Sequence, residues 1–565
     1  QNQVGQPLIV GPILLLMRDR LSAEAVTRGA ALLLDLSQVA PWARSGQNLV
    51  WISSCTVYRG CILDRVEDLT AAFGAIRNEL RISTVEGVQA DFSFHQHGPQ
   101  LQNGGYGHEF TLFVSRWAAL AEGTRFGFGD EAKGNLVSLV LDGSRWMVRQ
   151  RNFDLSARGR GISMPWTAEY ATALIPVARQ LAAIYPARAD ELKAFAEHIE
   201  GRGAPASVVG NKYFWRSDFM AQQRPDYYFS VKMCSSRTVG TELINRENLL
   251  GYWLSLGLTN ILHDGDEYKG IFPVWNWAQL PGVTAPDCVP SMLKFQTNLA
   301  DFVGGVSDGS IGAAAMVLQK DRLSGRKAWL LFDRAVVALG AGIGCPDDAA
   351  VLTTVNQCLL RGEVQADGQP VESGKAQPVS QWVSHDNVGY VFPDRQKAVV
   401  RAGPQTGNWR QICEMLTTDP VTKPVFSLFI EHGAKPRQAG YAYFILPSAS
   451  REETAAFAEK PSLEILANTP VLQAARELRS GIAELVFYEP GTCALKDGGE
   501  VTVDTPCLLI IKPRENGAVI TMATPLRTTK QVTLTLRAGA KRQTLVFPLP
   551  EGVRAGESAT QEVVW

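Results

Sequence analysis

Several features that mark whole classes of proteins are missing from this 565-residue sequence. With 55 Lys and Arg against 56 Asp and Glu, it lacks the positive excess of a general nucleic-acid-binding protein. It also lacks a charge-free run of about 18 or more apolar residues, so no membrane span is predicted. The balanced charge still allows a local basic cleft for an anionic polymer.

The nine cysteines are scattered and form no CxxC pair, so a zinc ribbon is not expected. An odd count leaves at least one thiol unpaired. Cys493 and Cys507 are candidates for a bridge across a late β-hairpin, and Cys55 and Cys61 for the closure of a short loop. Buried free thiols are at least as good an interpretation for most of the nine.

The length predicts two to four domains, and the first 200 residues have the apolar spacing of helices. Ser22 is a candidate cap for one helix and Asp68 for a second. A third helix is expected around Phe110 to Leu120, and a fourth over residues 166–185. Helices without intervening strands favour helical hairpins packed together.

The pattern changes near residue 203, where a Gly-Ala-Pro-Ala-Ser stretch is typical of a linker. Short β-rich runs separated by turn residues follow, which favours large antiparallel sheets. Candidate strands cover 227–233, 329–339, 425–430, 441–446, 502–511, 518–522, 532–536 and 545–549. We therefore predict an α+β multidomain chain with a helical domain over 1–203, a central β-sandwich over 212–459 and a C-terminal β-sandwich over 460–565.

Polar residues gather in four segments. Residues 91–107 form a glycine-rich loop with two histidines, several amides and Tyr106; residues 149–161 carry four arginines, which suit a carboxylate or sulfate. The other two are the short stretch around Asn48 and residues 232–253. From composition alone, an ordinary surface turn explains residues 91–107 about as well. A solvated, internally paired loop is the favoured interpretation of residues 149–161, and a turn residue that of Asn48.

Longer strings in these segments resemble polysaccharide lyase family 8, which includes chondroitin AC, hyaluronate and xanthan lyases. The strings are QHGPQLQNGGYG (96–107), RNFDLSARGRGIS (151–163), ENLLGYW (247–253), GDEYKGIFPVWNW (265–277), FVGGVSDGSIG (302–312) and WVSHDNVGYVFP (382–393). They stand in family order over most of the chain, and QHGPQLQ is most similar to the chondroitin AC branch. The resemblance implies an α/α toroid followed by antiparallel β-sandwich layers.

The resemblance also implies roles for particular residues in a β-elimination. The reaction removes the proton at C5 of a uronic acid and expels the sugar linked at O4, so the neighbouring carboxylate must be neutralised or hydrogen-bonded. Asn48 and His97 match the groups that contact this carboxylate, and Tyr106 matches the base that becomes the acid. Arg160 matches an arginine that supplies positive charge, and Glu242 the acid that orients it.

Four further residues are expected to bind substrate, namely Gln100, Asn103, Arg158 and Asn245, whereas His95 is interpreted as a loop or subsite residue. Two departures from the family pattern bear on specificity. Met164 stands where the family often has a second arginine, and the family's upstream tryptophan pair and first toroid helices are not in this sequence. Because the chain starts at Gln1, without a translation start or signal peptide, we expect a mature product or a fragment.

The expected partner is therefore an anionic polysaccharide, with no nucleic acid and no membrane span. The resemblance implies a secreted or periplasmic bacterial monomer that requires no cofactor, and it leaves room for a structural calcium ion. Alternatives are a glycan-binding protein with impaired catalysis and a lyase for another anionic polysaccharide such as xanthan. A glycoside hydrolase would need two carboxylates flanking a cleft, and these segments do not offer such a pair. Trp275 and Trp277 are expected in a β-domain core, and His385-Asp386 is interpreted as a structural pair.

Overall fold

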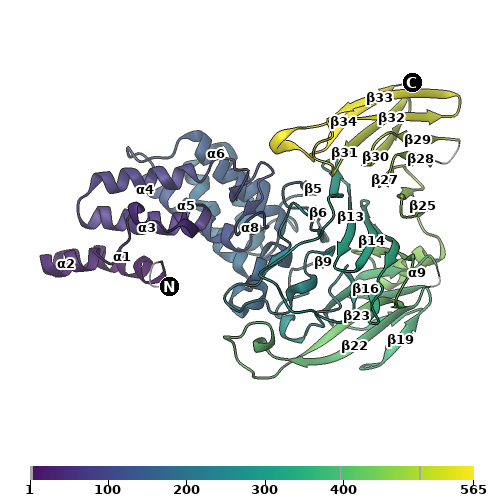
Figure 1. Cartoon of the computed structure of the whole chain (residues 1–565), viewed down its shortest axis with the longest axis horizontal. Helices are drawn as coiled ribbons and strands as arrows, with labels where there is room; N and C mark the ends of the chain where they lie inside the picture. The colour runs from purple at the N-terminus through teal and green to yellow at the C-terminus, as the bar shows by residue number, and fades with distance from the viewer. Residues whose placement is uncertain (1–3, 395, 496–497, 565) are drawn as a thin grey trace. The chain divides into compact units, whose positions relative to one another are not determined.

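The computed structural model describes residues 4–394, 396–495 and 498–564. By contacts the chain forms two compact units, coloured along the sequence in Figure 1. The helical unit comprises residues 1–153 and 169–207, and the sheet unit comprises residues 154–168 and 208–565. The segment 154–168, which carries Arg158 and Arg160, therefore packs with the sheets. The expected domain boundaries stay predictions, as does the interpretation of the chain's start, part of which (residues 1–3) lies outside the described residues.

The helical unit is built from eight α-helices and two very short strand pairs within the described residues. The helices are α1 (Gly5–Met17), α2 (Ala23–Ala30), α3 (Gly46–Ile62), α4 (Val66–Asn78), α5 (Tyr106–Ala121), α6 (Asp130–Ser138), α7 (Leu174–Ile184) and α8 (Ala189–Ile199). The strand pairs are β1 (Gly87–Val88) with β2 (Phe94–His95), and β3 (Val148–Arg149) with β4 (Asn152–Phe153). The predicted cap of α2 is confirmed, because the Ser22 hydroxyl accepts a hydrogen bond from the Ala25 amide.

Two helix predictions need correction. Asp68 is not a cap, because α4 begins two residues earlier and Asp68 lies in its first turn. The helix expected over 166–185 is only half present. Short 3₁₀ turns occupy its first part, and Glu169 adopts a left-handed backbone with φ of +58°, which a continuing α-helix does not allow. The α-helical segment starts at Leu174.

All strand pairs among the described residues of the sheet unit are antiparallel. Its first sheet has the order β5 (Gly210–Phe214), β6 (Phe219–Gln223), β7 (Tyr228–Lys232), β9 (Leu258–Leu262). A nine-stranded sheet has the order β12 (Val303–Ser307), β13 (Gly312–Lys320), β14 (Leu323–Leu331), β15 (Val336–Gly344), β24 (Ala439–Leu446), β21 (Val388–Val391), β20 (Trp382–His385), β17 (Val364–Ala366), β18 (Gln369–Pro370). A five-stranded sheet has the order β10 (Thr284–Pro286), β16 (Ala350–Leu359), β23 (Val421–Ala434), β22 (Ala398–Gly407), β19 (Ala376–Val379).

Two further sheets complete the C-terminal part of this unit, after the capped helix α9 (Arg451–Glu459). One has the order β25 (Leu463–Asn468), β26 (Leu472–Glu477), β27 (Ala483–Phe487), β30 (Cys507–Arg514), β31 (Gly517–Ala523), β34 (Ala559–Val564). The other has the order β28 (Gly491–Ala494), β29 (Glu500–Val503), β32 (Gln531–Ala538), β33 (Lys541–Pro548). A short pair, β8 (Thr241–Glu242) with β11 (Phe295–Gln296), holds one predicted site residue.

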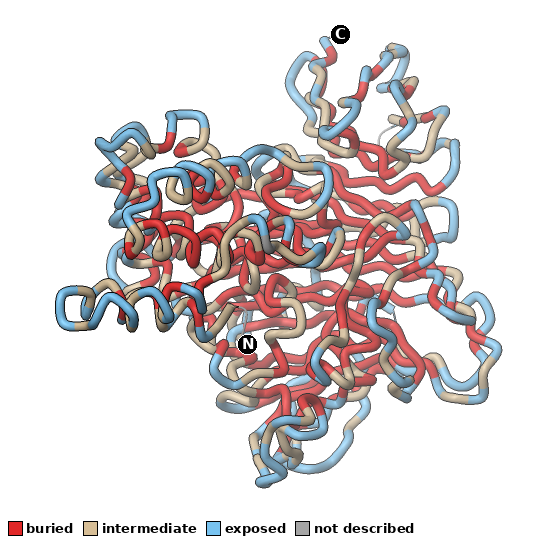
Figure 2. Tube along the Cα trace, turned by 60° about the vertical axis from the view of Figure 1, so that its left-hand side comes forward, coloured by how far each residue is buried: buried red, intermediate tan, exposed pale blue. Residues whose placement is uncertain are grey.

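Apolar side chains between these layers form the cores of the sheet unit. One cluster joins the nine-stranded and six-stranded sheets through residues such as Val337, Leu339 and Val486, and a second fills the space between the six-stranded and four-stranded sheets. Figure 2 shows buried residues running along the strands and exposed residues at the turns. The predicted helical part followed by antiparallel sandwiches is therefore confirmed.

Two strand predictions were wrong because polar turns interrupt them. The run 329–339 is a tight hairpin in which β14 ends at Leu331 and β15 begins opposite it at Val336. The run 502–511 is divided by Pro506, which has no amide hydrogen to donate, and β29 and β30 lie in different sheets.

The two disulfide candidates are also excluded, because all nine cysteines are free thiols. Cys493 and Cys507 are on strands of two different sheets rather than on one hairpin. Cys55 and Cys61 are both on α3, where six residues separate them by about 9 Å along the axis, too far for a disulfide. The alternative of free, mostly buried thiols is the correct one.

Candidate active site

In the helical unit, Tyr106 and His97 lie against each other. Tyr106 is the first residue of α5, and its ring centroid is 4.7 Å from that of His97 in an edge-to-face arrangement. Trp51 of α3 also packs against Tyr106, with 6.0 Å between the ring centroids. Tyr106 is half-buried, and the positive end of the α5 dipole lies at its backbone. The Tyr106 ring is therefore positioned by contacts with an imidazole and an indole ring.

The backbone around the start of α5 depends on glycine. A side chain at Gly104 would place its Cβ 2.9 Å from the Phe153 ring, and one at Gly107 would meet Phe94 and the Gln102 carbonyl at the same distance. His97 itself has a left-handed backbone with φ of +60°, and Gly98 follows with φ of +82°. The glycine-rich composition of the loop is thus explained by close packing around Tyr106.

Asn48 is in the first turn of α3 and is almost fully buried. Its amide nitrogen donates to the backbone carbonyl of Trp42 at 3.3 Å. The adjacent Gln47 amide donates to the side chain of Gln96, the residue before His97, at 3.0 Å. The helix start that carries Asn48 and the segment that carries His97 are therefore neighbours.

The predicted substrate-binding residues of this unit differ in their surroundings. Gln100 is buried, and neither side-chain amide atom has a hydrogen-bond partner within the described part of the chain. Asn103 is also buried, but its oxygen accepts from the Phe94 amide at 2.7 Å, which ties the loop together. His95 is buried on β2. Substrate binding by Gln100 and Asn103 stays a prediction.

In the sheet unit, Arg160 is held by two acidic side chains. Its guanidinium donates to Glu242 and, at 2.5 Å, to Glu247, and all three side chains are almost fully buried. Glu242 was predicted as a partner of this arginine. Glu247 was missed, although it opens the ENLLGYW string. Two carboxylates compensate the charge of one guanidinium, so Arg160 is fixed in orientation rather than left as an isolated positive charge.

The segment that carries Arg160 is anchored by Asp154, which sequence reasoning did not single out. The fully buried Asp154 carboxylate accepts hydrogen bonds from Tyr228 at 2.7 Å and Asn260 at 2.9 Å, and from Ser230. Burial raises the pKa of this carboxyl above its ordinary value, while the hydrogen bonds from the hydroxyls oppose that rise. Asp154 also accepts from the Ser156 amide at 2.7 Å, a local capping bond, but its partners on β7 and β9 are distant in the sequence and could not be predicted from a local pattern.

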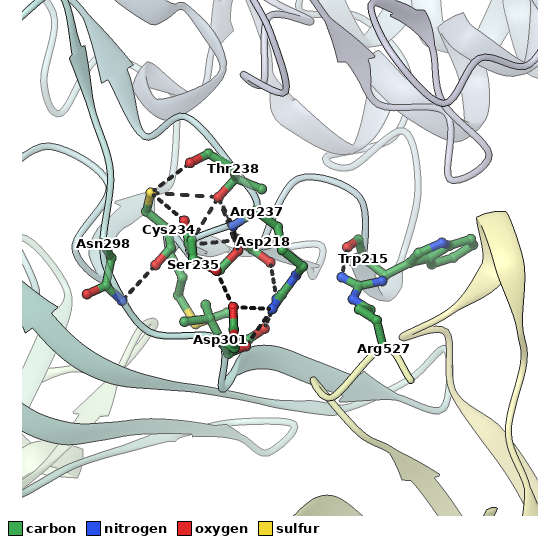
Figure 3. A network of polar contacts seen from close by, with 12 residues as sticks. Trp215, Asp218, Cys234, Ser235, Arg237, Thr238, Asn298, Asp301 and Arg527 are labelled. Atoms are coloured by element: carbon green, nitrogen blue, oxygen red, sulfur yellow. Dashed lines mark hydrogen bonds and ion pairs between the residues drawn. The ribbon is translucent and has the colours of Figure 1, made fainter. Parts of the chain in front are cut away.

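The loop that leads into Glu242 is fixed by a second buried carboxylate, Asp218 (Figure 3). It accepts from the Ser235 hydroxyl at 2.6 Å and the Thr238 hydroxyl at 2.7 Å. Asn248 then donates to the Glu242 carbonyl at 2.9 Å. Glu242 is therefore fixed at its backbone by Asn248 and at its side chain by the ion pair with Arg160.

The remaining predicted residues of the sheet unit are Arg158 and Asn245. Arg158 donates to Thr167 and stacks over the Phe272 ring at 5.6 Å. Asn245 is exposed in a turn with φ of +56°. Their binding roles stay predictions.

The predictions for Trp275, Trp277 and His385 as structural residues are confirmed. Both tryptophans are buried, and their indole nitrogens donate to the carbonyls of Gln357 and Phe272. His385 is buried, stacks on Phe426 and accepts from the Arg361 amide, and burial lowers its pKa to about 3. In the described ranges, no three His, Cys, Asp or Glu side chains gather as metal ligands would.

Comparison with known proteins decides the family. Models of polysaccharide lyase family 8 match three consecutive parts of the chain: the N-terminal α-helical domain at residues 1–199, the super-sandwich domain at 209–458 and the C-terminal β-sandwich domain at 464–533. Chondroitinase-AC of Pedobacter heparinus is 32% identical over 95% of this chain and 78% of its own length. The chain belongs to polysaccharide lyase family 8.

Two further proteins are similar to nearly the whole chain. A hyaluronate lyase of Thermasporomyces composti is 26% identical over 99% of this chain and 78% of its own length. The solved structure of a chondroitinase AC lyase in oligosaccharide complexes superposes with a TM-score of 0.95 at 31% identity, covering 100% of this chain and 85% of that one. The present chain is therefore an enzyme, a polysaccharide lyase. Within its described residues no helix has the length and apolar character needed to span a bilayer.

Proposed function

We propose that this family 8 lyase cleaves a uronic-acid-containing glycan of the chondroitin or hyaluronan type by β-elimination. The enzymes it resembles carry the names chondroitinase and hyaluronate lyase, which supports this substrate class. The observation that carries the mechanism is the pairing of the Tyr106 and His97 rings at 4.7 Å, with the start of the Asn48 helix hydrogen-bonded beside His97.

In the proposed reaction the phenolate oxygen of Tyr106 takes the proton from C5 of the uronic acid. The electron pair forms the C4–C5 double bond as the bond between C4 and the glycosidic oxygen breaks. The Tyr106 hydroxyl then returns the proton to that leaving oxygen, so no water is consumed. Negative charge grows on the uronate carboxylate during proton removal, and the Asn48 amide and the His97 imidazole are proposed to hydrogen-bond it.

Six other residues enter the proposal through the family resemblance. Gln100, Asn103, Arg158 and Arg160 stand in the quoted strings, and Glu242 and Asn245 lie just before the string at 247–253. Buried contacts with Glu242 and Glu247 fix the Arg160 guanidinium, which supports a role as an oriented hydrogen-bond donor. A secreted or periplasmic location and a monomeric state belong to the same proposal. So does catalysis without a metal, because every proton transfer in it uses a protein group.

To test the proposal, the purified enzyme is assayed for activity on chondroitin, chondroitin sulfate, hyaluronan and xanthan. Ultraviolet absorbance of the unsaturated uronate product is followed. Tyr106→Phe is expected to lose essentially all turnover while polymer binding persists, because only the phenolic oxygen is removed. Lack of product on every uronic-acid polymer would refute the proposed function. Turnover retained in Tyr106→Phe would move the base elsewhere, with His97 the next candidate.

A further inference from the structure

The start of α3, which carries Asn48, is not capped by its own sequence. Ser45 stands at the N-cap position, yet its side chain makes no capping bond to the helix. Other segments satisfy the first amides instead. The Gly46 amide donates to Glu79 at 2.6 Å, and the Gln47 amide donates to the side-chain oxygen of Gln96 at 3.0 Å. Free amides at a helix start need acceptors, so these contacts fix where the helix begins.

Gln96 and Glu86 link this helix start to both sides of His97. The buried amide nitrogen of Gln96 donates to Glu86 at 2.6 Å. The same Glu86 carboxylate accepts from the Ser45 hydroxyl at 2.9 Å and from the Gly98 amide at 2.8 Å. One carboxylate thus binds the residue before α3 and residues on both flanks of His97.

The close approach of the two segments requires glycine at position 46. Gly46 has φ of +58°, and a Cβ there would lie 2.2 Å from the Gln96 side-chain oxygen. A side chain at this position would displace Gln96 and break the bridge to α3. The backbone conformation and the side-chain contacts therefore select the same arrangement.

We propose that Gln96 and Glu86 are positioning residues for the elimination. They hold the Asn48 end of α3 and the His97 segment in one geometry, so that both side chains meet the same substrate carboxylate. The inference rests on the proposed function, since it takes Asn48 and His97 as the carboxylate-binding pair. Gln96 and Glu86 act through these two residues.

A charge swap tests the bridge. Gln96→Glu keeps the size of the side chain but sets two carboxylates against each other at the 2.6 Å contact. Adding Glu86→Gln restores a hydrogen bond between an amide and a carboxylate, with the donor now at position 86 and the acceptor at position 96. We expect Gln96→Glu to lower kcat by about 10- to 100-fold with KM changed by less than about threefold, as for loss of a charged hydrogen bond that orients catalytic groups. The double variant is expected to recover most of kcat.

Hydrogen exchange supplies a measure that does not depend on activity. Amides over residues 46–49 and 98–100 are expected to exchange faster in Gln96→Glu and to regain protection in the double variant. Glu67→Gln is the matched control, because this glutamate lies in the first turn of α4 with 73% of its side chain exposed. Gln96→Ala removes the bridge without adding a charge, and serves if Gln96→Glu does not fold.

The outcomes separate the two levels of the proposal. Wild-type kcat in a folded Gln96→Glu or Gln96→Ala enzyme would overturn the positioning role, as would a double variant no better than the single one. An inactive wild type overturns the proposed function instead. Hydrogen exchange still tests the bridge in that case. The bridge is refuted if these amides are as well protected in the Gln96→Glu variant as in the wild type.

Discussion

Glu79 should make the stability of the helical unit depend on pH in a direction opposite to that of most carboxylates. Burial raises the pKa of this half-buried carboxyl from 4.5 to about 7; repulsion from Glu86 adds to the rise, and the hydrogen bond from the Gly46 amide opposes it. Between these two values the unfolded chain loses a proton that the folded chain keeps. Stability therefore falls as pH rises through this window, and above about pH 7 the cost is complete.

Glu79→Gln removes this titration and keeps an oxygen that can accept from the Gly46 amide. At 1.36 kcal/mol per pKa unit, the cost removed is at most about 3 kcal/mol, and partial exposure of the side chain reduces the expected gain to about 2 kcal/mol. The variant should therefore match the wild type at pH 4.5 and be more stable by about 2 kcal/mol at pH 8.

Urea unfolding followed by helical circular dichroism at both pH values measures this difference. Glu67→Gln provides the control, since its exposed side chain should leave the wild-type pH dependence unchanged. A difference between Glu79→Gln and the wild type that is the same at pH 4.5 and pH 8 would refute the reasoning, because the effect would then not come from ionisation.

Four other predictions concern the site and the core. Trp42→Ala should raise KM several-fold without lowering the melting temperature, because this tryptophan is 53% exposed beside Asn48; an unchanged KM contradicts a role in holding polymer. Glu242→Ala should lower kcat at least about tenfold and cost about 1–3 kcal/mol in denaturant unfolding, since Arg160 loses one buried carboxylate partner and keeps Glu247. Trp275→Ala should lower the free energy of unfolding by about 3–5 kcal/mol and leave kcat per folded molecule unchanged. A loss of stability under about 1 kcal/mol would contradict a core role. Chelation with EDTA should leave kcat unaltered, and loss of kcat that added calcium restores would show that a metal is needed.

Periodicity predicted elements well where one face is buried and local signals agree. The Ser22 cap, the start of α2 and the apolar face of α5 follow from neighbouring residues. The predictions failed where a short polar turn interrupts apolar runs, as between β14 and β15. The β propensity on both sides of such a turn is high, so the run looks continuous until pairing within the sheet is known.

For the site, long family-like strings identified the residue types but not their partners. Tyr106 and His97 could be singled out because they stand in such a string, and Asn48 because the short stretch around it resembles the family. Asp154 and Glu86 could not, because an isolated carboxylate looks the same whether it is solvated or accepts several hydrogen bonds.

The sequence by itself determined the order of helices and sheets, the family and the residues expected to carry the elimination, because each depends on local composition or on an ordered string. The tertiary structure decided what holds those residues in place. Glu247 shares Arg160 with Glu242, and Gln96 joins the Asn48 helix to the His97 segment. These contacts join residues tens of positions apart, and their donors and acceptors meet only when the chain has folded.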